Sequence, residues 1–200
     1  HTRFRNVTGV QTCALPIWNP DQRPGDNLYS DCVVALEAST GKLRWHFQFT
    51  PNDGYDYDSV QIPVLADMNW KGRPAKVMMW ANRNGYFYVL DRVTGKFLLG
   101  EPFVKVNWAS GLDANGRPKQ TPQPPGLPTW PGNQGGTNWY PPSYNPLTGL
   151  FYFSVWENYA TIYRKEEQEY VPGRNFLGGG FTVVAPAPGA PTIGIGRRGP

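Results

Sequence analysis

Residues 33–45 read VVALEASTGKLRW, and two later stretches of the chain repeat this pattern. They are residues 87–97 (FYVLDRVTGKF) and residues 142–152 (PSYNPLTGLFY). Each stretch has a short apolar or aromatic run, an acidic or amide residue, two spacers, Thr-Gly and a second apolar run. This order is typical of a β-hairpin, because the polar side chain caps the turn and glycine adopts the positive φ that the turn needs.

The spacing of the three stretches predicts the architecture. Their glycines, Gly41, Gly95 and Gly149, lie 54 residues apart both times. A repeat of this length built from short strands is typical of β-propeller blades with long loops. The alternative, three unrelated hairpins, does not explain the equal spacing. We therefore expect an all-β fold, a partial β-propeller of about three blades. Because propellers close with about four to eight blades, we expect an interior piece of a longer protein.

The composition agrees with this fold and argues against two classes of partner. The chain has 23 Gly, 21 Pro and 29 aromatic residues (8 Trp, 11 Tyr and 10 Phe), which favours short strands and tight turns over long helices. No apolar run reaches the roughly 18 residues of a membrane span, so we expect none in this chain. The net charge of +4 comes from scattered basic residues, which do not predict a nucleic-acid surface.

The two ends of the chain differ from its middle. Residues 7–17 (VTGVQTCALPI) resemble one reading frame of a sequencing-library adapter, so we predict that residues 1–17 are non-native. The alternative is an ordinary irregular arm. Without them the net charge is +2 and Cys32 is the remaining cysteine, which excludes a disulfide within the chain. We expect propeller blades over residues 18–180, and disorder in the Pro/Gly/Ala-rich residues 181–200.

An acidic segment, residues 50–59 (TPNDGYDYDS), is the strongest candidate for a functional site. Asp56 and Asp58 are two positions apart, which in an extended segment places both carboxylates on one face. Two such carboxylates repel each other unless a cation or a shared proton lies between them. Asp, Asn and Gly are also common in turns. The residue types therefore leave two interpretations open, a solvated turn and a binding site.

Five stretches together resemble the pyrroloquinoline-quinone (PQQ)-dependent alcohol dehydrogenases, the methanol/ethanol dehydrogenase family. They are residues 23–29 (RPGDNLY), 35–45 (ALEASTGKLRW, a tryptophan-docking repeat with Glu37 in place of Asp), 50–58 (TPNDGYDYD), 82–92 (NRNGYFYVLDR) and 135–139 (GGTNW). The resemblance covers roughly residues 18–180. It implies an eight-bladed quinoprotein propeller that oxidises a primary alcohol to an aldehyde, with hydride transfer to metal-bound PQQ. It also implies cytochrome c as the electron acceptor and a periplasmic location.

The resemblance assigns roles to individual residues. Asp56 would be the catalytic general base and a metal ligand, Arg83 would donate to the quinone oxygens, and Asn138 and Trp139 would contact the quinone. Trp45 would dock one blade on the next. We expect Asp56 on one blade and Arg83 on the next to converge at the hub. The alternatives are a surface ion pair for Arg83, and a Gly-rich turn followed by a core tryptophan for the other two.

Asp58 bears on the choice of metal. A second carboxylate two residues after the base is a feature of the family members that prefer lanthanides, and a trivalent ion is better held by one more carboxylate. The resemblance therefore implies that Asp58 joins Asp56 at a lanthanide-capable site. The alternative is a calcium enzyme in which Asp58 is a turn residue.

A non-catalytic propeller scaffold, built from the same repeats and serving in assembly or binding, is the competing function. A scaffold would need neither Asp56 nor Arg83, and both are present in their expected segments, which favours the enzyme. The family's other metal ligands, a Glu and an Asn, would lie upstream of this chain. We therefore expect no activity from the chain by itself.

Overall fold

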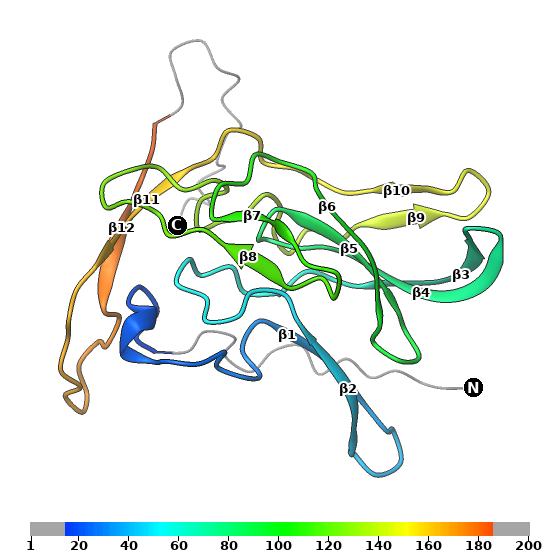
Figure 1. The fold of residues 1–200 in the computed structure, drawn as a ribbon, viewed down its shortest axis with the longest axis horizontal. Coiled ribbons are helices and arrows are strands. Elements are labelled where there is room, and N and C mark those ends of the chain that lie inside the picture. Colours follow the sequence, from blue (N-terminus) through cyan, green and yellow to red (C-terminus); the bar gives the residue numbers. More distant parts are fainter. Residues whose placement is uncertain (1–14, 186–200) are drawn as a thin grey trace, which may run out of the picture.

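The computed structural model describes residues 15–185, and these form a nearly all-β structure (Figure 1). Its one helix in this range is a three-residue 3-10 turn, η1 (Pro20–Gln22), so the described part holds no helix that could cross a membrane. The strands are β1 (Cys32–Leu36), β2 (Leu43–Gln48), β3 (Val64–Trp70), β4 (Arg73–Ala81), β5 (Tyr86–Asp91), β6 (Phe97–Pro102), β7 (Ala109–Leu112), β8 (Pro118–Gln120), β9 (Ser143–Asn145), β10 (Leu150–Tyr152), β11 (Thr161–Lys165) and β12 (Gly179–Val183).

The centre of the structure is a four-stranded antiparallel sheet in the order β3-β4-β5-β6, the arrangement of a propeller blade. The other strands pair two by two, as β1-β2, β7-β8, β9-β10 and β11-β12. The three Thr-Gly stretches form the turns of β1-β2, β5-β6 and β9-β10, so the predicted hairpins are confirmed. In each turn the glycine has a φ of +70° to +75°, and its amide donates to the carbonyl four residues earlier at 2.8 to 2.9 Å.

Trp45, at the end of the first repeat, packs on the glycine of the second. A Cβ atom placed on Gly95 would lie 2.6 Å from the indole of Trp45, whereas one on Gly149 would meet nothing within 4 Å. A glycine at position 95 therefore leaves room for a flat ring to rest on the neighbouring turn. The blade-docking role expected of Trp45 is confirmed for this pair of repeats.

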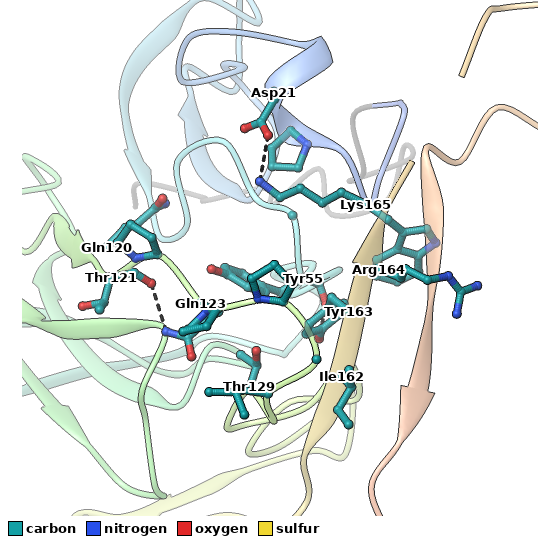
Figure 2. A pocket seen from close by; sticks show the side chains of 18 of the residues that line it. Asp21, Tyr55, Gln120, Thr121, Gln123, Thr129, Ile162, Tyr163, Arg164 and Lys165 are labelled. Carbon is teal, nitrogen blue, oxygen red and sulfur yellow. Dashed lines mark hydrogen bonds and ion pairs between the residues drawn. The ribbon is translucent and has the colours of Figure 1, made fainter. Parts of the chain in front are cut away.

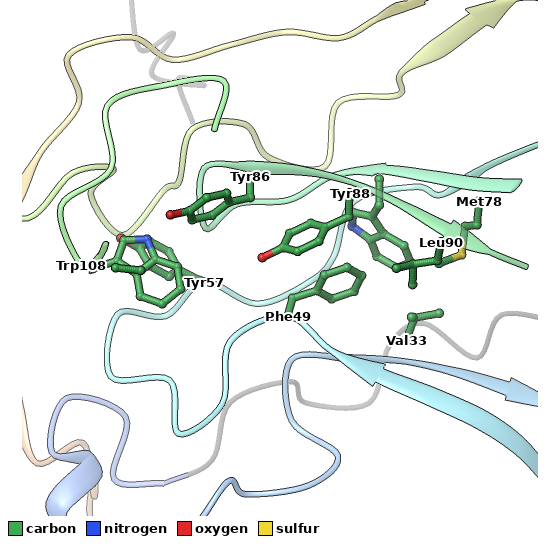
Figure 3. Packing of buried hydrophobic residues seen from close by; sticks show 10 residues of the cluster. Val33, Phe49, Tyr57, Met78, Tyr86, Tyr88, Leu90 and Trp108 are labelled. Atoms are coloured by element: carbon green, nitrogen blue, oxygen red, sulfur yellow. The ribbon is translucent and has the colours of Figure 1, made fainter. Parts of the chain in front are cut away.

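The central sheet is buried on both faces. On one face Met78 and Trp80 pack with Phe49, Tyr88 and other members of an aromatic-rich cluster that reaches the first hairpin (Figure 3). On the other face Val77 and Met79 pack towards the aromatic side chains of β9 and β10. The two central strands therefore read as apolar runs rather than as an alternating pattern.

The expected disorder of residues 181–200 is wrong at its beginning. Phe181 to Val183 belong to β12, which pairs with β11 so that Phe181 lies opposite Tyr163. The Phe181 ring also packs on Trp18, with centroids 5.1 Å apart. This pairing and this aromatic contact come from residues distant in sequence, so the local composition did not reveal them. Residues 186–200 lie outside the described residues.

The predicted non-native segment also falls mostly outside the described residues, since residues 1–14 are not described. Residues 15–17 are described, and they contact the body of the chain. The carbonyls of Pro16 and Ile17 accept hydrogen bonds from the Arg23 guanidinium at 3.0 and 3.1 Å. The non-native origin of the segment stays a prediction.

Substitution of Gly95 by Ala tests the tryptophan contact. Both Gly95→Ala and the matched Gly149→Ala put a side chain at positive φ, which costs about 1–2 kcal/mol. The first substitution alone overpacks Trp45, which costs about 1–3 kcal/mol more. We therefore expect Gly95→Ala to lower the free energy of unfolding further than Gly149→Ala in urea titrations. Equal losses would show that Trp45 does not press on this turn.

Candidate active site

The predicted catalytic segment and the predicted cofactor-binding arginine meet at one end of the central sheet. Residues 51–63 lead into β3, and residues 82–85 join β4 to β5. Since β3 and β4 are antiparallel, with Val64 opposite Met79, the start of β3 and the end of β4 lie at the same end of the sheet. Asp56 lies in the connection that leaves the β1-β2 hairpin and enters the central sheet, and Arg83 lies in the β4-β5 turn of that sheet.

The Arg83 guanidinium contacts both acids of the segment. One terminal nitrogen lies 3.4 Å from Asp58 Oδ2 and the other 3.9 Å from Asp56 Oδ2. The Arg83 side chain is 7% exposed, against 15% for Asp58 and 23% for Asp56, so the alternative of a surface ion pair is wrong. Arg83 also donates to the carbonyl of Asn133. The convergence predicted for Asp56, Asp58 and Arg83 is thus observed.

One nitrogen of the guanidinium is left over. The Nε atom of Arg83 is buried and has no hydrogen-bond partner among the described residues. A buried N–H group without an acceptor is costly, so such groups are rarely left alone in a functional protein. This donor therefore lacks an acceptor within residues 15–185.

A buried tyrosine, Tyr57, lies between Asp56 and Asp58 in sequence, and both acids face Arg83. Tyr57 is fully buried, its hydroxyl donates to the carbonyl of Pro131 at 2.6 Å, and its ring lies 5.4 Å from that of Trp108 (Figure 3). Asp56 has a φ of +63°, which is uncommon for a residue with a side chain. The segment is therefore neither a regular extended strand nor a solvated turn, so the interpretation as a solvated turn is wrong.

Asp53 and Arg23, which sequence reasoning did not assign to the site, hold this loop. The Asp53 carboxylate accepts hydrogen bonds from the amides of Tyr55 and Tyr57 at 2.8 and 2.7 Å. Arg23 is 9% exposed and donates to the carbonyl of Asp53 and to the side chain of Asn52 at 3.1 Å. Both residues lie in stretches that carried the family resemblance, which was the available signal for them.

A third buried acid lies behind the loop. Asp31 is 1% exposed and accepts a hydrogen bond from Ser59 Oγ at 2.6 Å, while Asn82 Nδ2 donates to the same Oγ at 2.8 Å. The network joins the loop of Asp58 to the turn of Arg83. The second oxygen of Asp31 has no partner among the described residues.

Burial and mutual repulsion act on the carboxyls of this region. Burial raises the pKa of Asp31 to about 6, and the charge of Asp58 acts in the same direction. Burial also raises the pKa of Asp53 well above its usual range, with a further contribution from Asp31, and two backbone N–H bonds oppose the rise. Carboxyls that resist ionisation together form a place where a cation would be stabilising.

The described residues do not by themselves complete a metal site. No group of three or more His, Cys, Asp or Glu side chains within residues 15–185 is arranged to hold an ion. Asp56 and Asp58 supply carboxylate oxygens, which are the hard donors that Ca²⁺ and lanthanide ions require. Their chemistry fits such an ion as part of a larger ligand set, and their role as metal ligands stays a prediction.

The Gly-rich loop of residues 135–139 lies against the backbone of Arg83. The amide of Gly136 donates to the Arg83 carbonyl at 2.9 Å, and a Cβ atom on Gly135 would lie 2.6 Å from the same oxygen. The absence of a side chain at Gly135 therefore allows this close approach. The loop brings the predicted quinone-contacting residues to the same end of the blade.

Asn138 and Trp139 differ in their surroundings. Asn138 is 5% exposed and its amide group bonds within its own loop, to the Gln134 carbonyl at 3.1 Å and from the Trp139 amide at 2.9 Å. Trp139 is 59% exposed and stacks on Tyr140, so the alternative of a core tryptophan is wrong. Quinone contact by either residue stays a prediction.

A separate cavity of about 610 Å³ is lined in part by Tyr55 (Figure 2). Its walls come from the proline-rich residues 120–129, the loop before β3, and β11 with β12. They include Tyr55, Tyr163, Gln123 and Thr129. Asp56, Asp58 and Arg83 do not line it. The cavity and the acidic site are therefore distinct features of the described chain.

Comparisons with known proteins identify the family of the chain. The model of the family described as glucose/ethanol/alcohol dehydrogenase, β-propeller domain (PQQ) matches residues 9–124, beginning inside the segment predicted to be non-native. The quinoprotein alcohol dehydrogenase PedH of Pseudomonas putida is 45% identical over 180 residues, which cover 83% of this chain and 30% of that protein. The 1-butanol dehydrogenase (cytochrome c) of Thauera butanivorans is 40% identical over 181 residues, covering 83% and 26%.

A solved structure gives the same result. The europium-containing methanol dehydrogenase superposes with a TM-score of 0.76 at 37% identity, covering 83% of this chain and 30% of that one. The fold is thus part of a quinoprotein β-propeller, as expected. The chain belongs to the PQQ-dependent alcohol dehydrogenase family, and it spans three tenths or less of the length of these relatives.

The buried carboxyl of Asp31 predicts a pH-dependent stability. Its pKa is about 6 in the folded protein against 3.8 when unperturbed, so between these values only the unfolded state loses the proton. Folding stability therefore falls as pH rises through this window, by roughly 1–3 kcal/mol. We expect the free energy of unfolding of Asp31→Asn to rise relative to that of the natural protein as the pH goes from 4 to 7. Urea unfolding with a chelator present measures it. A difference that is constant with pH would contradict the burial of an ionisable Asp31.

Proposed function

We propose that this chain carries part of the active site of a PQQ-dependent alcohol dehydrogenase that oxidises a primary alcohol to an aldehyde. The observation that carries the proposal is the contact of one buried guanidinium with two carboxylates at the end of a propeller blade. Because the chain spans three tenths or less of its relatives, the activity belongs to the longer protein that contains it.

Asp56 acts as the general base. Its carboxylate is the more exposed of the two acids, so it is the one that an alcohol hydroxyl can reach. It accepts the hydroxyl proton as hydride leaves the carbinol carbon. Its left-handed backbone and the buried Tyr57 fix the direction of this carboxylate.

Arg83 binds the oxygens of the cofactor. Its Nε donor is buried and has no partner within residues 15–185, and a planar guanidinium fork suits two neighbouring oxygen atoms. A fixed positive group of this kind stabilises negative charge that develops on nearby oxygen atoms without reorganisation. When bound, PQQ supplies the hydride acceptor, with its cation as a Lewis acid, while this chain orients both.

Asp56 and Asp58 hold the cation, which we propose to be a lanthanide ion, with Ca²⁺ as the alternative. The two carboxylates carry two negative charges against the one positive charge of Arg83. A trivalent ion benefits most from such a site. The similar europium-containing methanol dehydrogenase supports this choice.

The proposal also includes an electron acceptor and a location. The name of the Thauera relative includes cytochrome c, which supports a cytochrome c as the electron acceptor of this protein. A periplasmic location accompanies that assignment as part of the proposal. The competing function, a non-catalytic propeller scaffold, does not explain why a buried arginine faces two acids in the expected segments.

Replacement of the base tests the proposed reaction. Asp56→Asn keeps the shape of the side chain and removes its basicity, so we expect dye-linked alcohol oxidation to fall by about 10²–10⁴-fold. The assay uses the longest natural gene product that contains this sequence, reconstituted with PQQ and metal. Asp113→Asn, in the exposed β7-β8 turn, is the control and should keep full activity. Full activity of Asp56→Asn would exclude Asp56 as the base.

Removal of the second acid tests the choice of metal. We expect the natural protein to be active with La³⁺, and we expect Asp58→Ala to lose this activity by at least tenfold while retaining more of any activity with Ca²⁺. The reason is that a trivalent ion loses more than a divalent ion when one carboxylate is removed. Titration of the apo-protein with each metal, followed by the same assay, measures the effect. Activity with Ca²⁺ alone in the natural protein would refute the lanthanide assignment.

A further inference from the structure

We propose that Asp53 is the positioning residue that holds Asp56 in its functional conformation. The proposal rests on the proposed function, because it concerns the carboxylate named there as base and metal ligand. Asp53 itself does not contact substrate or cofactor in this proposal. It acts through the backbone of the loop.

The hydrogen bonds of Asp53 are made to backbone amides on either side of Asp56. Oδ1 accepts from the Tyr55 amide at 2.8 Å, and Oδ2 accepts from the Tyr57 amide at 2.7 Å. The Tyr57 amide belongs to the peptide unit that directly follows Asp56, and the Tyr55 amide lies one residue before Asp56, between Gly54 and Tyr55. Because the two bonds fix the chain on both sides, they hold Asp56 at its φ of +63°.

Asp53 is itself anchored to the body of the protein. Its carbonyl accepts a hydrogen bond from the Arg23 guanidinium, which also bonds to the carbonyls of Pro16 and Ile17. Arg23 is almost fully buried. Asp53 is therefore held by buried Arg23 through its carbonyl, and it holds the loop of Asp56 through its carboxylate.

A second aspartate in the chain shows how the two hydrogen bonds of Asp53 differ from those of an ordinary turn. In the β7-β8 turn a single oxygen of Asp113, Oδ1, accepts from both Asn115 and Arg117 at 2.8 and 2.9 Å. An asparagine has one acceptor oxygen and can make both of those bonds. At Asp53 each oxygen takes one amide, so an asparagine would lose one bond and turn an NH₂ group towards an N–H donor.

The pair Asp53→Asn and Asp113→Asn is therefore a matched test. In the longest natural gene product, without metal, we expect Asp53→Asn to speed hydrogen exchange of the Tyr55 or Tyr57 amide at least tenfold. Asp113→Asn should leave exchange at its own turn within about twofold. If Asp53→Asn does not fold, the natural protein still decides, since the Tyr57 amide must be protected well above the amides of exposed turns.

A metal probe gives the functional consequence. Terbium luminescence, excited through the tyrosines of the loop, measures Tb³⁺ binding without turnover. We expect Asp53→Asn to weaken Tb³⁺ affinity by about 10–100-fold, as is usual when a partner of a ligand-bearing group is removed. The turnover number should fall with KM for the alcohol within about twofold, whereas a merely structural loss would lower the folded fraction and leave Tb³⁺ affinity of the remainder unchanged.

The outcomes separate this proposal from the proposed function. Unchanged amide exchange and Tb³⁺ affinity in Asp53→Asn would overturn the positioning role, even if Asp56→Asn is inactive. Faster exchange confined to the loop would support the role, even if Asp56→Asn proves active and the proposed base is wrong. A natural protein that binds no Tb³⁺ refutes the lanthanide site, and the exchange comparison still decides the role of Asp53.

Discussion

A buried positive charge is the constraint on which the arrangement of this site depends. A guanidinium removed from water is costly unless opposite charges and hydrogen-bond acceptors surround it. Arg83 finds these in Asp56, Asp58 and the Asn133 carbonyl, which come from two different loops. These contacts with Arg83 hold the loop before β3 and the loop after β8 at the same end of the central sheet. One nitrogen, Nε, finds no acceptor among the residues that the structure describes.

The blade beneath supplies the rigidity that such a site needs. The β3-β4-β5-β6 sheet is packed on both faces, by the cluster around Phe49 on one and by the aromatic residues of β9 and β10 on the other. Trp45, lying on Gly95, fixes the first hairpin against this sheet. Residues placed on loops at the end of a rigid sheet can be held in uncommon backbone conformations, as Asp56 is.

Where the sequence was insufficient, the missing information was non-local. The two-residue spacing of Asp56 and Asp58 suggested an extended segment, but burial of Tyr57 and a left-handed Asp56 give the same shared direction by another route. The composition after residue 180 suggested disorder, whereas pairing with β11 makes Phe181 part of a strand. The roles of Asp53 and Arg23 depend on contacts with backbone atoms, which residue types do not reveal.

The sequence by itself determined the repeat, the hairpin turns, the all-β class, the docking tryptophan and the family, because each follows from local residue patterns or from several motifs taken together. It also identified Asp56, Asp58 and Arg83 as the residues to examine. Only the tertiary structure decided that they meet at one end of the central sheet, since strand pairing sets which loops lie at the same end. The structure also decided which polar groups are buried, and burial is what makes this cluster of charges demand partners.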